Sequence, residues 1–192
     1  MRSQAILFVF FTFLLAAASA AAQTDKTFTR EGLTFNYPSG WAITEGVDAN
    51  ADQLNFSRAD LDVQLTVNVF KTPLNTPEKL AEAKKVLVDR YIEQTVKSFA
   101  DAGGKPVSKP ATSEISGVVS QGVSVSASLD GVSGAIFVQT AVVSERMVVM
   151  TLLGPAADVK KATATWDMIR TTMKIEPPPN PTPAATPVTK KP

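Results

Sequence analysis

Carboxylates are the main acid–base groups with which this chain could do chemistry near neutral pH, because the sequence contains neither histidine nor cysteine. A Ser-His-Asp triad, a thiolate nucleophile and the usual zinc sites are therefore excluded. The sequence also lacks the GxxxxGKS/T loop that cradles phosphates and the GxGxxG turn that binds dinucleotides. We therefore predict a protein that is not an enzyme and needs no cofactor or metal.

The closest candidate pair of carboxylates is Asp60 and Asp62. Two such groups could share a proton or hold a divalent cation through their oxygens. A hydrolase that uses them on envelope polysaccharide is the alternative function. Both residues nevertheless fall in a predicted turn, where aspartate is favoured for its hydrogen bonds to the local backbone.

Asp48, Asn50 and Asp52 place oxygen ligands at alternate positions, as calcium-binding loops do. The glycine expected at the sixth position of such a loop and the glutamate expected at the twelfth are both missing. A calcium-responsive adhesion module is a further alternative.

Two aromatic residues close to the start of the predicted domain, Tyr37 and Trp41, could stack on a sugar or an aromatic ligand. They could equally anchor the first hairpin to the core. Together with Asp60 and Asp62 they are the candidate residues of a ligand-binding surface.

Both ends of the chain differ in composition from the part between them. Residues 1–22 combine Arg2, an apolar run over 5–15 and small residues at 20–22, which predicts an export signal cleaved before Gln23. An uncleaved anchor is the alternative, although the run is short for a membrane span. Residues 177–192 are rich in proline and predict a disordered or extended tail, which is either a solvated segment or a ligand for an envelope partner.

Residues 23–176 are therefore expected to form a single domain in a periplasmic or extracellular protein that is not stably inserted in the membrane. The whole chain has 19 basic and 18 acidic residues. Removal of the signal takes away one basic residue, Arg2, so the remaining chain has no net charge at pH 7. Nothing then attracts nucleic acid or an anionic membrane surface.

The elements that must position these residues follow from the hydrophobic period. Alternation predicts strands at 32–38, 41–45, 53–58 and 63–70, the last two joined by 59–62. Thr76-Pro77 then predicts a helix start. Leu80, Ala83, Leu87, Tyr91 and Gln94 form its apolar stripe, with Val88, Ile92, Val96 and Phe99 flanking it. Gly103-Gly104 predicts its end.

The second half of the domain is predicted to be a meander followed by a helix. The strands are 117–129, 132–143 and 147–153, with turns at Asp130-Gly131 and at 144–146. The last two are apolar on both faces, which predicts central strands covered on both sides. A helix follows, with Val159, Ala162, Trp166, Ile169 and Met173 on one stripe. We predict an α+β fold of order ββββ-α-ββββ-α, a mostly antiparallel sheet flanked by helices.

This layout resembles a known family. Residues 32–41 (GLTFNYPSGW) are similar to the N-terminal signature of PsbP-like and DcrB-like proteins of the Mog/PsbP superfamily, and residues 168–175 (MIRTTMKI) resemble its closing segment. The resemblance implies an α/β/α sandwich. Family members include photosystem accessory subunits and bacterial envelope proteins, so it also implies an accessory or binding module whose partner is an envelope protein or a small ligand. The lipoprotein cysteine of the DcrB-like members is absent here, as are the histidines that serve metal sites in some photosynthetic members.

Overall fold

The computed structural model describes residues 24–177 of the chain, with the exception of the Leu87 side chain. The predicted export signal and nearly all of the predicted proline-rich tail lie outside the described residues. The strands before the long helix are β1 (Asp25–Arg30), β2 (Leu33–Pro38), β3 (Ala42–Gly46), β4 (Ala51–Ser57) and β5 (Gln64–Phe70). The helical segment consists of α1 (Pro77–Ala83), η1 (Lys84–Asp89) and α2 (Arg90–Asp101). The second half contains β6 (Val107–Ile115), β7 (Val118–Leu129), β8 (Val132–Val143), β9 (Arg146–Pro155), α3 (Ala156–Thr172) and β10 (Lys174–Ile175).

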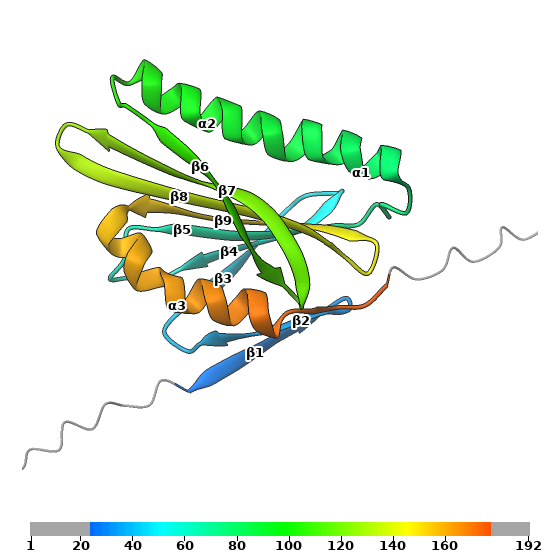
Figure 1. Cartoon of the computed structure of the whole chain (residues 1–192). Coiled ribbons are helices and arrows are strands. Elements are labelled where there is room, and N and C mark those ends of the chain that lie inside the picture. The colour runs from blue at the N-terminus through cyan, green and yellow to red at the C-terminus, as the bar shows by residue number, and fades with distance from the viewer. Residues whose placement is uncertain (1–23, 178–192) are drawn as a thin grey trace, which may run out of the picture.

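Two antiparallel sheets are built from these strands. The larger has seven strands in the order β3-β4-β5-β9-β8-β7-β6, and the smaller has three in the order β1-β2-β10. As Figure 1 shows, the α1–α2 helix lies along one face of the large sheet, while α3 and the small sheet lie on the other side. The predicted α+β fold with a largely antiparallel sheet between helices is therefore confirmed.

The core is divided between the two faces of the large sheet. The larger cluster lies under α3 and the small sheet and includes Phe35, Leu65, Met150 and Ile169, none of which is more than 1% exposed. The smaller cluster lies under the α1–α2 helix and includes Val88, Val138 and Met147. Alternate residues of β8 and β9 enter opposite clusters, which confirms that these two strands are central and covered on both sides.

Tight turns connect the meander. At Asp130-Gly131 both residues have positive φ (50° and 80°), as a two-residue type I′ hairpin requires. Ser144 and Glu145 adopt positive φ as well (49° and 63°) without a glycine. The helix start is also confirmed, because the Thr76 Oγ1 atom accepts a hydrogen bond from the Lys79 N–H at 3.3 Å.

The predicted strand ranges need three corrections. A strand, β1, precedes the first predicted one, and β6 is the fourth strand of the predicted ββββ group after the long helix but had no predicted range. Both escape the pattern because they are edge strands: nearly every residue of β1 is exposed, and β6 carries Lys109 and Pro110. The third correction is β10, two residues long, which pairs with β2.

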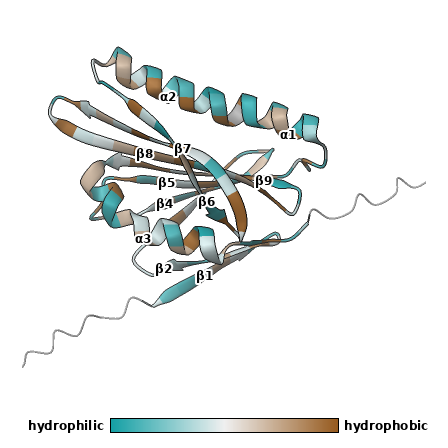
Figure 2. Ribbon diagram, in the orientation of Figure 1, coloured by the Kyte–Doolittle hydropathy of each residue, from teal (hydrophilic) through white to brown (hydrophobic). Residues whose placement is uncertain are grey.

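The apolar stripe of the long helix also differs from the prediction. Val88 is buried, and Ile92, Val96 and Phe99 pack against the same cluster, whereas Leu80 and Tyr91 of the predicted stripe are 39% and 37% exposed. Ala83 of the predicted stripe does pack against this cluster. The shift begins after it, at the π-helical segment η1, which fits one extra residue into the helix and so rotates the face of the residues that follow, Tyr91 among them. The residues predicted to flank the stripe therefore face the sheet. Figure 2 shows that hydrophilic and hydrophobic residues are mixed along α1 and α2.

Candidate functional site

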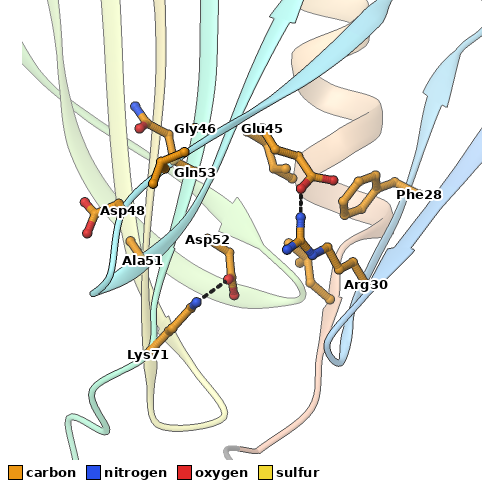
Figure 3. A pocket seen from close by; sticks show the side chains of 12 residues that line it. Phe28, Arg30, Glu45, Gly46, Asp48, Ala51, Asp52, Gln53 and Lys71 are labelled. Carbon is orange, nitrogen blue, oxygen red and sulfur yellow. Dashed lines mark ion pairs between the residues drawn. The ribbon is translucent and has the colours of Figure 1, made fainter.

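A cavity of about 370 Å³ lies between the small sheet and the β3–β4 edge of the large sheet. We call it the inter-sheet pocket. Figure 3 shows its lining: Phe28, Arg30, Leu33, Glu45, Gly46, Val47, Asp48, Ala51, Asp52, Gln53, Leu54 and Lys71. The residues come from four strands, the β3–β4 loop and the position after β5, so only the tertiary fold brings them together.

The wall of the pocket at the small sheet is closed by an ion pair between Arg30 of β1 and Glu45 of β3. Arg30 also lies 3.6 Å from the Glu31 carboxylate. Each side chain of the Arg30–Glu45 pair is nearly half exposed, so solvent screens it and its contribution to stability is small. Its role is geometric, because it connects the two sheets at the edge of the cavity.

A second charged group surrounds Asp52. One oxygen of Asp52 lies 3.2 Å from the Lys71 Nζ atom, and the other accepts from the Arg146 Nη2 atom at 2.7 Å. Arg146 also donates from its Nε atom to the Phe70 carbonyl oxygen at 3.2 Å. The Arg146 side chain is only 7% exposed and that of Asp52 only 15%, so this pair is shielded from water. The sequence places Arg146 in the predicted turn at 144–146. In the structure it is instead the first residue of β9, and it is buried beside Asp52.

Apolar side chains complete the lining. Leu33 and Leu54 are buried, and Phe28 stacks on Phe35 with 5.0 Å between the ring centroids. The pocket thus combines an apolar surface with positive groups at Arg30 and Lys71 and negative groups at Glu45, Asp48 and Asp52. Such a lining suits a small ligand that presents both hydrogen-bond donors and acceptors.

Asp60, one of the four candidate residues from the sequence, is an exposed turn residue. Its two oxygens accept from the Arg58 Nε and Nη2 atoms at 2.6 and 2.9 Å. These hydrogen bonds hold the pKa of the Asp60 carboxyl below its usual value. Asp60 is therefore kept ionised by a neighbour two residues away.

Asp62 lies two residues further along the same turn, and its backbone N–H donates to the Asp158 Oδ2 atom at 3.2 Å. The Lys161 ammonium, 2.8 Å from the other oxygen of Asp158, and this N–H group lower the pKa of the Asp158 carboxyl. The contact ties the β4–β5 turn to the start of α3.

The two aromatic candidates both belong to the core region. Trp41 is 3% exposed, with the Arg58 guanidinium 5.8 Å from its ring centroid. Tyr37 is partly buried and packs edge-on against Phe35 and Phe56. Arg58 thus links Trp41 to Asp60, but the four candidates do not line the inter-sheet pocket.

In the Asp48-Asn50-Asp52 segment, the candidate calcium-binding loop, several side-chain oxygens are already engaged in contacts within the protein. The Asp48 Oδ1 atom accepts from the Asn50 N–H at 2.7 Å, and Asp52 faces Arg146 and Lys71. Over residues 24–177, acidic side chains do not gather in the groups of three that could hold a metal ion.

Sequence reasoning missed Arg30, Glu45, Lys71 and Arg146. Their only signal was charge at the ends of strands, and they lie far apart in the chain. Within residues 24–177, moreover, no helix combines the length and the apolar character needed to cross a membrane.

Comparison with known proteins gives a likeness of fold. Neither a family model nor a curated protein matches the sequence. Among solved structures, a protein from Bacteroides thetaiotaomicron is similar with a TM-score of 0.51 at 12% identity, over 79% of this chain and 48% of that one. This chain therefore spans about half the length of the Bacteroides protein. At such low identity the match shows the fold alone.

Two further solved structures are similar over most of their own length. Cyanobacterial PsbP from Synechocystis gives a TM-score of 0.49 at 14% identity, over 84% of this chain and 98% of that one. LpqN of Mycobacterium tuberculosis, a protein involved in cell envelope biogenesis, gives 0.45 at 13% identity, over 80% and 91%. A PsbP protein is thus among the solved structures to which this chain is similar.

Proposed function

We propose that this protein is an exported, non-enzymatic accessory protein that binds a small polar ligand in the inter-sheet pocket. The observation that carries the proposal is the lining of that pocket, in which positive and negative groups surround an apolar floor. Export rests on the signal pattern of residues 1–22.

Binding is favoured over catalysis by the state of the carboxylates in the pocket. Glu45 is paired with Arg30, Asp52 is paired with Lys71 and Arg146, and Asp48 accepts a backbone hydrogen bond. At least one oxygen of each carboxylate is therefore already held in a fixed contact, whereas a general acid or base needs an oxygen that can reach the reacting group of a substrate. A ligand can instead share these hydrogen-bonding groups without any proton transfer. The hydrolase based on Asp60 and Asp62 stays a prediction that this geometry does not favour.

The pocket also restricts the ligand. Its volume of about 370 Å³ is near the lower end of the range for small-molecule sites. Its three acidic side chains are balanced by Arg30 and Lys71 in the lining and by Arg146 beside Asp52, so the pocket offers no net positive charge to a free polyanion. A dipolar molecule, or a neutral one rich in hydroxyl groups, can form hydrogen bonds with both the basic and the acidic side chains of the lining.

The test is an NMR titration of residues 23–192 with glycylglycine as the dipolar probe, glucose as the neutral probe and inorganic phosphate as the anion. We expect glycylglycine or glucose to shift the amide signals of Arg30, Gly46 and Gln53, and phosphate to leave them unchanged. Lys71→Met should weaken that response, whereas Lys97→Met, on the exposed face of α2, should not. Shifts with phosphate alone, or with none of the three probes, would refute the proposal.

A further inference from the structure

A second cavity, of about 480 Å³, lies between α1 and the end of the large sheet. We call it the α1 groove. Its apolar lining consists of Phe70, Leu74, Ala83, Val86 and Met147. Asp48 lines both this groove and the inter-sheet pocket, so the two cavities are neighbours.

The helix above the groove buries few of its side chains. Neither α1 nor α2 contributes a buried residue among those described, and Val88 of the π-helical segment η1 is the helix's buried anchor. Val86, two residues before this anchor, is 52% exposed although it lines the groove. With Phe70 and Leu74 it gives the groove a continuous apolar lining that an apolar segment can cover.

The end of the described chain lies close to this groove. The Ile175 carbonyl oxygen accepts a hydrogen bond from the Ser144 hydroxyl at 2.8 Å. Glu145, which follows Ser144, accepts a hydrogen bond at its carbonyl oxygen from the Leu74 N–H at 2.7 Å. Standard backbone dimensions then place Ile175 within about 20 Å of Leu74. The residues after Pro177 can span about 45 Å as an extended polyproline chain, so they reach the whole groove.

The composition of residues 177–192 also fits the groove. Proline, alanine and valine supply apolar contacts, and Lys190 and Lys191 are the only charged residues of the segment. The groove carries Asp48 and Glu82 against a single cation, Lys79. A cationic end can therefore pair with the acidic rim while the prolines contact the apolar floor.

We propose that the proline-rich segment 177–192 binds in the α1 groove of its own chain. A tether raises the effective concentration of the segment to the millimolar range, so a weak contact is enough to occupy the groove. The bound segment covers Val86 and Leu74 and competes with any other partner for this surface. The proposal does not rest on the ligand of the inter-sheet pocket, although the two cavities share Asp48.

The absence of cysteine makes a direct test possible, because one introduced thiol carries one spin label. The test uses residues 23–192 with Val188→Cys bearing a nitroxide, and measures paramagnetic broadening of the methyl signals of Leu74, Ala83 and Val86. The control label is placed at Val132→Cys, in an exposed position at the far end of β8.

We expect the Val188 label to broaden the groove signals selectively and the Val132 label to leave them sharp. Lys190→Glu with Lys191→Glu, and separately the exposed-site variant Val86→Asp, should remove most of the broadening. Weak, uniform broadening over the whole surface would overturn the proposal. So would groove broadening seen only when spin-labelled and isotope-labelled chains are mixed, because the segment would then bind a second copy.

Discussion

At the scale of single residues, the most consequential charge in the domain is Arg146. Its guanidinium is buried beside Asp52 and also donates to the Phe70 carbonyl oxygen, so it connects β4, β5 and β9. Exposed pairs such as Lys97–Asp101 have no such protection from solvent. Burial therefore separates structural ion pairs from those that solvent screens.

Arg146→Met should lower the free energy of unfolding by about 2–4 kcal/mol, because Asp52 loses its shielded partner and keeps only Lys71. Lys97→Met should change it by less than about 0.5 kcal/mol. Urea unfolding at neutral pH measures both. Equal effects for the two variants would show that the Arg146 pair is not shielded from water.

At the scale of elements, one π-helical turn in the long helix changes which of the following residues face the sheet. The amphipathic stripe read from the sequence assumes a regular helix, in which Leu80, Ala83 and Tyr91 share one side. The π-helical turn at Lys84–Asp89 shifts the following residues, so Val88 and Ile92 face the sheet instead. The sequence predicts that a helix forms here and that Thr76 caps its N-terminus. It does not predict which residues of the helix face the sheet.

Two neighbouring valines test this shift. Val88 is 2% exposed and Val86 is 52% exposed, so Val88→Ala should cost about 1–3 kcal/mol and Val86→Ala less than about 0.5 kcal/mol. Chemical denaturation of both variants gives the comparison. A regular helix would place neither residue at the centre of the predicted stripe, and the two costs would then be similar.

At the scale of the whole molecule, the two faces of the large sheet differ in how firmly they are covered. The helix α3 buries Val159, Ala162, Thr165, Trp166 and Ile169. Its end is also fixed, since the Arg170 carbonyl oxygen accepts from the Ser116 N–H at 2.8 Å and its Nη1 atom donates to the Glu114 carbonyl oxygen at 2.9 Å. In α2 no described residue is buried.

Amide hydrogen exchange should therefore be faster in α2 than in α3 by about tenfold or more, because α2 can separate from the sheet without disrupting the larger core. Exchange measured by mass spectrometry on residues 23–192 tests this. Equal protection in the two helices would show that the domain opens as one unit.

The sequence alone determined the elements whose signal is local. The alternation of β5 and β7–β9, the Asp130-Gly131 turn, the Thr76 cap and the stripe of α3 all depend on residues close together in the chain, and all are confirmed. The edge strands β1 and β6 are exposed over most of their length, with only Phe28 and Ile115 in contact with the larger core, so no alternating pattern revealed them.

Only the tertiary structure decided which side chains form a site. The inter-sheet pocket joins Arg30 to Glu45 and Asp52 to Lys71 and Arg146, across strands that are neighbours in space but distant in sequence. No local period records such pairings. The Arg30–Glu45 pair depends on how the two sheets pack, and the contacts of Asp52 depend on which strands are neighbours within the large sheet. The residue types limited which chemistry was possible, and the tertiary structure decided which charged residues line the inter-sheet pocket.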